Sequence, residues 1–301
     1  MNNLQLDCAL SYLNEGKIIN PIELLSEQIS YEINQFNSLM ESDNIINESI
    51  SGYIANGFKK IVEFIKNIVT KIAEKIKYLF DKNKVAAKAT ELKAHKYLND
   101  KNVDEKISNN IADFKDYMTN QINNHFGDKS ANESTLLQEE SINIPSLKDG
   151  EVFIIGIDSV KINFIGNMID QLEAGPFGDS ADKYREIVNE INSIDVTNIF
   201  KFKKIRCTRD FISPARIKSQ YKEINDNISL VENNNKKLDK LGRTIEKRIN
   251  SGLFDDDSKE VLKEMQRAIP AISTFCINEL EQLNWANQFA TKNYNHIFAA
   301  L

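Results

Sequence analysis

From Ser213 onward, the sequence carries a stripe of residues spaced alternately by four and three positions. This spacing puts the stripe on one side of a helix and is typical of the seam of a heptad coiled coil. A seam Asn, here Asn235, specifies helix register at some cost in stability. The pattern predicts a long helix whose seam is an assembly surface for another helix, of the same chain or of a different one. The seam consists of Ile217, Tyr221, Ile224, Ile228, Val231, Asn235, Leu238, Gly242, Ile245 and Ile249.

A second long helix is expected after a short connection, over residues 259–301. Gly252 suits the C-terminal cap of the first helix, and Asp257 or Ser258 suits the N-cap of the second. Pro270 lies inside the second helix and is expected to kink it. Two long helices with a short connection predict an antiparallel, coiled-coil-like hairpin over residues 213–301.

The first strong helical region covers residues 51–98. Between Gly57 and Lys84, eight lysines and three acidic residues surround an apolar face, which makes this a basic amphipathic helix with a net charge of +5. Two interpretations stand. The face packs into a helical bundle, as most such faces do, or it lies in a membrane interface. Its residues include Phe58, Ile61, Ile65, Ile68, Ile72 and Ile76.

The middle of the chain is predicted to contain the only strands. We expect strands at 151–158 and 198–207 that pair with each other, and helices at 103–126, 160–172 and 181–194. Eleven Gly and five Pro among 301 residues favour long helices elsewhere. The predicted fold class is therefore mainly α with a small α+β insert. The predicted regions are an acidic segment (1–50), a helical region (51–130), a linker (131–150), the insert (151–212) and the hairpin (213–301).

Sequence motifs of catalysis and cofactor binding are not found. The chain lacks GxxxxGK[ST], GxGxxG, HExxH and GxSxG. Cys8, Cys207 and Cys276 lie far apart with no CxxC, so neither a disulfide framework nor a zinc site is predicted. We expect no catalytic residue, no metal and no cofactor, and hence a protein that is not an enzyme. Asp158 keeps one alternative open, an enzyme centred on 151–212, because α/β enzymes often place a carboxylate at the end of a strand.

Charge is distributed unevenly along the chain. Residues 1–48 contribute −7 to the net charge of −6, so the rest of the chain sums to about +1. A cationic cluster lies on the second predicted strand and just after it, and could contact phosphates of nucleic acid. The other interpretation is a solvated face that balances the acidic N-terminal segment. The cluster consists of Lys201, Lys203, Lys204, Arg206 and Arg209.

No targeting or membrane-spanning segment is predicted. The N-terminal sequence lacks the basic start and long apolar run of a signal peptide. No uninterrupted apolar run approaches the ~20 residues that a spanning helix needs. We expect synthesis in the cytoplasm, with the cysteines reduced.

The opening segment, LQLDCALSYLNEGK, resembles the capsid-targeting peptides of internal head proteins in large contractile-tailed bacteriophages of the T-even type. Those peptides are short and apolar, and end in Leu or Ile, any residue, Glu and a small residue, where the prohead protease cuts. Two stretches fit that pattern, Leu13-Asn14-Glu15-Gly16 and Ile46-Asn47-Glu48-Ser49. The resemblance therefore implies cleavage at Glu15 and Gly16 or at Glu48 and Ser49.

Two further stretches are similar to virion proteins of such phages, the Lys-rich SISGYIANGFKKIVEFIKNIVTKIAEKIKYLF and the tail CINELEQLNWANQFATKNYNHIFAAL. The resemblance implies a non-enzymatic internal head, prohead core or head-associated protein, located in the phage head after synthesis in the host cytoplasm. Its implied partners are other virion proteins or further copies of itself through helical packing, and packaged DNA, with transient membrane contact. The alternative function is a membrane-active amphipathic protein, ejected or host-directed, that uses residues 58–80.

Overall fold

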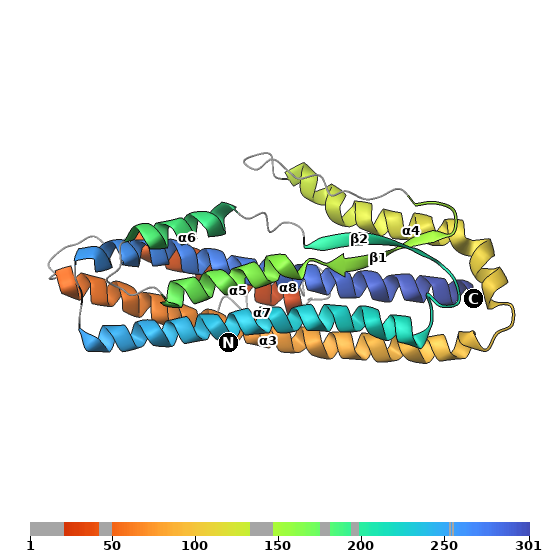
Figure 1. The fold of residues 1–301 in the computed structure, drawn as a ribbon, viewed down its shortest axis with the longest axis horizontal. Coiled ribbons are helices and arrows are strands. Elements are labelled where there is room, and N and C mark those ends of the chain that lie inside the picture. The colour runs from red at the N-terminus through yellow and green to blue at the C-terminus, as the bar shows by residue number, and fades with distance from the viewer. Residues whose placement is uncertain are drawn as a thin grey trace, which may run out of the picture. The chain divides into compact units, whose positions relative to one another are not determined.

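The structure, a computed structural model, describes residues 21–41, 50–132, 147–174, 181–193, 199–252, 254 and 256–301. It is 85% helical, with one small antiparallel pair of strands among the described residues, which confirms the predicted mainly α fold with a small α+β insert. The elements, drawn in Figure 1, are α2 (Pro21–Glu41), α3 (Ile50–Leu98), α4 (Val103–Asn132), β1 (Glu151–Ile157), α5 (Ser159–Ala174), α6 (Ala181–Ser193), β2 (Phe200–Arg206), α7 (Pro214–Ser251) and α8 (Asp256–Ala300).

The chain divides into two compact units, and both are discontinuous in sequence. Unit 1 comprises Met1–Tyr78, Phe164–Ile194 and Glu232–Asn278, and unit 2 comprises Leu79–Asn163, Asp195–Val231 and Glu279–Leu301. Four boundaries fall inside α3, α5, α7 and α8, so each of these helices contributes one part to each unit.

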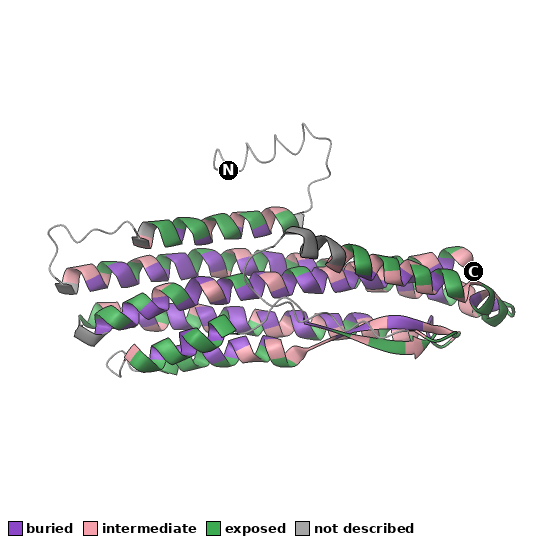
Figure 2. Ribbon diagram, turned by 90° about the horizontal axis from the view of Figure 1, so that it is seen from above, coloured by how far each residue is buried: buried purple, intermediate pink, exposed green. Residues whose placement is uncertain are grey.

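In unit 1, the first part of α3 packs against parts of α7 and α8. The helices approach closely at two glycines: a Cβ at Gly242 would lie 2.9 Å from Ile65 Cγ2, and one at Gly57 would lie 2.5 Å from Leu262 Cδ2. Helix α2 covers α3, with the Phe36 and Phe64 rings stacked at 4.4 Å. As Figure 2 shows, α3 and α7 carry both buried and exposed residues, as expected of amphipathic helices. Helix α8 is buried over most of its surface, and between Ile269 and Ala290 only Thr274 and Glu281 are exposed.

In unit 2, a buried polar network joins α3, α7 and α8. Asn83 Nδ2 donates to the Tyr221 carbonyl oxygen at 2.9 Å and to Asn225 Oδ1 at 2.7 Å, and Asn287 Nδ2 donates to Asn83 Oδ1. The Tyr221 hydroxyl also contacts Thr291 Oγ1 at 2.9 Å. Because each of these polar groups is paired only in this alignment, the network helps to fix the register of the three helices.

The two strands pair antiparallel, in register from Glu151 opposite Arg206 to Ile157 opposite Phe200. Their pairing and the helices α5 and α6 match the predicted insert closely. Helix α4 is longer than expected and runs to Asn132, into the predicted linker, of which residues 133–146 lie outside the described part.

At the connection between α7 and α8, the structure has the predicted C-terminal cap of α7 but not the predicted N-cap of α8. Gly252 has a φ of +66°, the left-handed conformation that favours Gly after a helix end, as expected. Helix α8 begins at Asp256, so Asp257 and Ser258 lie within its first turn and are not the N-cap. Helix α8 also continues through Pro270.

Candidate functional site

The cationic cluster lies on β2 and on the segment that leads to α7. Side chains alternate between the two faces of a strand, so Lys201 and Lys203 share one face with Ile154 and Gly156, their partners in β1. All the basic residues of the strand, namely Lys201, Lys203, Lys204 and Arg206, are exposed. Strand β2 pairs with β1 along one edge only, within the described residues. Long side chains from both faces of β2 can therefore reach its open edge.

Aromatic side chains hold β2 in place. The Phe200 ring lies 5.1 Å from the ring of Trp285 on α8, and the Phe202 ring lies 6.1 Å from that of Phe126 on α4. The ring of Phe153 on β1 lies 6.0 Å from that of Phe202. These contacts explain the alternation of Phe and Lys at the start of β2, where Phe200 is buried and Phe202 half-buried while the lysines are exposed.

The five cations of the cluster are not equivalent. Lys201 pairs with Asp158 at 3.0 Å, and Arg209 pairs with Asp104 at 3.3 Å. Lys203 lies over Gly156, where an added Cβ would be 2.9 Å from the lysine Nζ. Among the described residues, neither Lys203 nor Arg206 forms an ion pair, although Glu151 is opposite Arg206 in the strand pair. These two side chains therefore carry the positive charge that is most available to an external anion.

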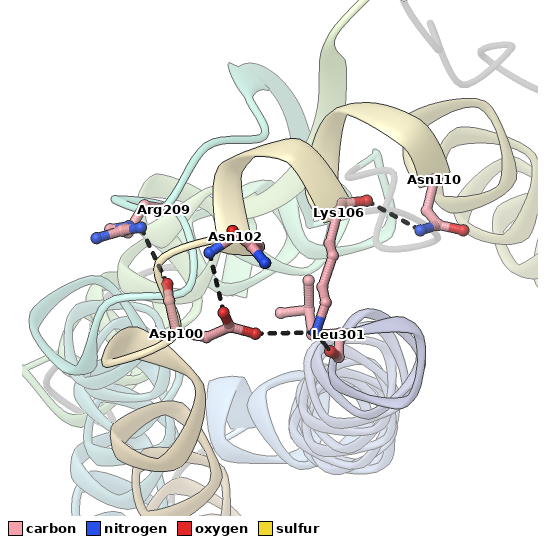
Figure 3. Close-up of polar contacts among 6 residues, drawn as sticks. All are labelled: Asp100, Asn102, Lys106, Asn110, Arg209 and Leu301. Atoms are coloured by element: carbon pink, nitrogen blue, oxygen red, sulfur yellow. Dashed lines mark hydrogen bonds and ion pairs between the residues drawn. The ribbon is translucent and has the colours of Figure 1, made fainter.

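Arg209 belongs to a polar clamp at the turn between α3 and α4 (Figure 3). Its guanidinium donates to the Asp100 carbonyl oxygen at 3.2 Å. The Asp100 carboxylate accepts from Lys106 Nζ at 2.8 Å and from the Asn102 N–H at 2.9 Å, and Lys106 also donates to the Leu301 carbonyl oxygen. Hydrogen bonding to Lys106, then to Asn102, lowers the pKa of Asp100 from its ordinary value. Arg209 thus has a structural role in joining segments of unit 2.

Asp158 acts as a helix cap. One carboxylate oxygen accepts from the Val160 N–H at 3.2 Å in the first turn of α5, and the other pairs with Lys201. Burial raises the pKa of Asp158, but the Lys201 ammonium and the Val160 N–H outweigh it and hold the pKa below its ordinary value. Capping and ion pairing account for this carboxylate without a reaction.

An open groove of about 460 Å³ lies beside Asp158, between α7 and the turn that joins β1 to α5. Glu223 in this groove accepts the Ile157 N–H at 3.2 Å, and Lys222 pairs with Asp226 at 2.6 Å. Asp158 is not among the described residues that line the groove, which are Ile157, Ser159, Ser219, Lys222, Glu223, Asp226, Asn227 and Leu230. The structure therefore does not bring Asp158 together with the polar groups that an enzyme centred on this insert would need.

The predicted apolar faces lie in the interior. Phe58, Ile61, Ile65, Ile68, Ile72 and Ile76 are all buried in unit 1. Membrane contact through this face would require it to leave the core. The predicted seam is likewise buried, except for the half-buried Ile249. Asn235 Nδ2 donates to the Val69 carbonyl oxygen on α3 at 2.9 Å, so the seam packs within the chain.

Glu279 is a buried ionisable residue that was not predicted from the sequence. It lies on α8, three residues after Cys276 and four before Leu283, at a position where the apolar pattern lacks an apolar residue. That gap is the signal that could have revealed it, because a residue in phase with an apolar stripe is buried whatever its type. Burial raises its pKa to about 8.

The remaining predictions concern cleavage sites, metal ligands and membrane-spanning helices. The cleavage candidates Glu15, Gly16, Glu48 and Ser49 lie outside the described residues. Within the described ranges, no group of three or more His, Cys, Asp or Glu side chains is placed to hold a metal ion. None of the described helices combines the length and the apolar character needed to span a membrane.

The comparisons with known proteins found no family model that matches the chain, and no similar curated protein or solved structure.

Proposed function

We propose that this chain is a non-enzymatic virion protein of a tailed bacteriophage, internal to the head or bound to it, which contacts packaged DNA through β2. The observation that supports the DNA contact is the exposure of Lys203 and Arg206, which form no ion pair among the described residues, on a strand held by aromatic packing. The virion assignment rests on the resemblance of the N-terminal sequence, with its two motifs that end at Gly16 and Ser49.

A structural role is supported by what the side chains do in the described chain. The apolar stripes of α3, α7 and α8 pack inside the two units and leave mainly polar outer surfaces. Two ionisable groups that could serve in catalysis have structural partners: Asp158 caps α5, and His296 pairs with Asp113 at 2.7 Å and stacks on Tyr117. Such contacts favour rigidity over reactivity.

Phosphate binding suits the chemistry of β2. Lys and Arg side chains that neutralise phosphates release condensed counterions, so affinity falls steeply as salt rises. A strand fixed by ring packing presents its cations with little loss of entropy. Removal of residues 1–48 by cleavage after Glu48 would also remove a net charge of −7 and reduce repulsion from DNA.

The DNA contact predicts a specific salt response. In filter binding of duplex DNA by the full chain, Lys203→Glu/Arg206→Glu should lower the magnitude of the slope of log affinity against log salt by about 2, since each lost phosphate contact accounts for roughly one unit. The matched control is Lys247→Glu/Lys263→Glu, two exposed lysines of unit 1, which changes net charge equally. Equal slopes for the two variants would contradict a DNA contact at β2.

The virion assignment has its own test. Intact-mass analysis of the protein from purified phage particles should give a chain that begins at Gly16 or Ser49. A full-length mass would contradict processing, and absence of the protein from purified particles would contradict the virion assignment itself.

A further inference from the structure

The outer side of α3 in unit 2 carries two of the most exposed large apolar side chains of the described residues. Val85 is 69% exposed and Leu92 is 59% exposed. They lie seven residues apart, two helical turns, and so share one face. The buried side of the same helix carries Asn83, Thr90 and Ala94. Val85 and Leu92 therefore belong to an outward-facing apolar stripe that the rest of unit 2 leaves in solvent.

Three lysines flank this stripe. Lys84, Lys88 and Lys96 are exposed and lie beside or between Val85 and Leu92 on the helix surface, and one exposed acidic residue, Asp81, lies a turn before Val85. We call Val85, Leu92 and the three lysines the α3 strip. A purely anionic partner such as phosphate would leave Val85 and Leu92 without apolar contacts. The composition of the strip instead fits a surface that combines carboxylates with apolar area.

The outer face of α2 has the complementary composition. Helix α2 contains four glutamates and no Lys or Arg. Its inner side is buried, whereas Glu23, Glu27 and Tyr31 recur every fourth residue along its exposed side. Tyr31 is 44% exposed, which makes it another of the exposed large apolar side chains. We call Glu23, Glu27 and Tyr31 the α2 strip.

We propose that the α3 strip of one copy docks on the α2 strip of a second copy. Glutamates then face lysines while the Tyr31 ring covers Val85 or Leu92, so each strip supplies what the other needs. The contact uses different surfaces on the two copies and is heterologous, so it can repeat from copy to copy. This self-association does not depend on the proposed DNA contact at β2, because it involves neither Lys203 nor Arg206. It requires a chain that keeps α2, so cleavage after Glu15 would preserve it and cleavage after Glu48 would end it.

The size and charge of the strips determine how the contact behaves. Each strip spans only two to three helical turns, so the buried area belongs to the small class of interfaces typical of weak association. Attraction between exposed charges is screened by salt. Self-association should therefore increase with protein concentration and decrease with ionic strength.

Sedimentation velocity of the full chain over a concentration series tests the proposal. At low salt, the wild type should form species larger than the monomer. Lys84→Glu/Lys88→Glu should weaken this association about tenfold or more, because like charges then face each other. Glu23→Lys/Glu27→Lys should do the same, and the variant with all four changes should associate again because the charges are exchanged. The control is Lys247→Glu/Lys263→Glu, which should associate like the wild type.

Three results would overturn the proposal. They are a wild type that remains monomeric throughout the series at low salt, a Lys84→Glu/Lys88→Glu variant that associates as well as the control, and a four-residue variant that does not regain association. Far-UV circular dichroism identifies any variant that has lost its fold. Mixing the two double variants gives a second measurement that needs no further substitution. The acidic α3 strip of one variant should bind the basic α2 strip of the other.

Discussion

At the scale of single residues, Glu279 combines complete burial with a carboxyl group whose oxygens accept no hydrogen bond within the described residues. Desolvation raises its pKa from the ordinary value of 4.5 to about 8, so the group is protonated when the protein is folded at neutral pH. In the unfolded chain the same group is ionised at that pH. Folding must therefore take up a proton at Glu279, which costs free energy.

The first prediction concerns the pH dependence of stability. Between pH 4.5 and about 8 the folded state binds one more proton at Glu279 than the unfolded state, so the free energy of unfolding falls as pH rises. The loss approaches about 1.4 kcal/mol per pH unit, or about 3 kcal/mol by pH 7. Glu279→Gln, which cannot ionise, should match the wild type near pH 4.5 and be more stable at pH 7.

Urea denaturation at a series of pH values measures this effect as the difference between variant and wild type. Glu260→Gln, at an exposed position of α8, is the control and should leave the pH dependence of the wild type unchanged. A difference between Glu279→Gln and wild type that does not grow with pH would refute the assignment of a raised pKa to Glu279.

At the scale of elements, apolar periodicity predicted the helices well because burial imposes it directly. The stripe from Phe58 to Ile76 and the seam from Ile217 to Ile245 are buried as the pattern requires. The two strands followed from short β-branched or aromatic runs, since such residues suit a pleated surface. Pattern alone could not identify what the seam contacts, because a seam looks the same whether its partner helix belongs to the chain or to another copy.

Polar residues in the interior were harder to predict than apolar ones. Asn83 and Glu279 occupy in-phase positions, but a search for apolar residues passes over them. For a cluster of charged residues, the sequence likewise does not reveal which of them form ion pairs. Lys201 and Lys203 are equivalent in the sequence, yet Asp158, 43 positions before Lys201, pairs only with Lys201. Pairing over such separations depends on the fold, so sequence predicted the cationic strand but not which of its charges remain available.

The close packing at Gly242 predicts how the substitution Gly242→Ala changes the free energy of unfolding. Ala is favoured over Gly in a helix by about 1 kcal/mol, so propensity alone predicts that Gly242→Ala stabilises α7. The added Cβ would lie 2.9 Å from Ile65 Cγ2, and such overpacking in a core costs about 1–3 kcal/mol. We expect a net destabilisation of about 1 kcal/mol in chemical denaturation. Asn233→Ala, at an exposed position of the same helix, should be neutral or slightly stabilising; a Gly242→Ala variant more stable than wild type would contradict the close packing.

At the scale of the whole molecule, the two units are linked by continuous helices. The chain runs through unit 1 and unit 2 repeatedly, and the boundaries cut α3, α5, α7 and α8. Contacts between distant segments define the units, and no local composition change marks their limits. Four of the five boundaries lie within a helix, and the fifth, between Ile194 and Asp195, lies outside the described residues.

This continuity predicts that the units unfold together. If unit 1 unfolded alone, four helices (α3, α5, α7 and α8) would have to end at internal positions, without caps. Leu262→Ala in unit 1 removes a buried side chain and should cost about 2–5 kcal/mol. The only tryptophan, Trp285, lies in unit 2 and reports its unfolding by fluorescence, while far-UV circular dichroism reports all helices.

We expect Leu262→Ala to lower the urea midpoint of both signals equally, whereas the exposed control Lys259→Ala should leave both midpoints unchanged. A fluorescence midpoint that stays at the wild-type value while the dichroism midpoint falls would mean that unit 1 unfolds independently, and that helix continuity does not couple the two units.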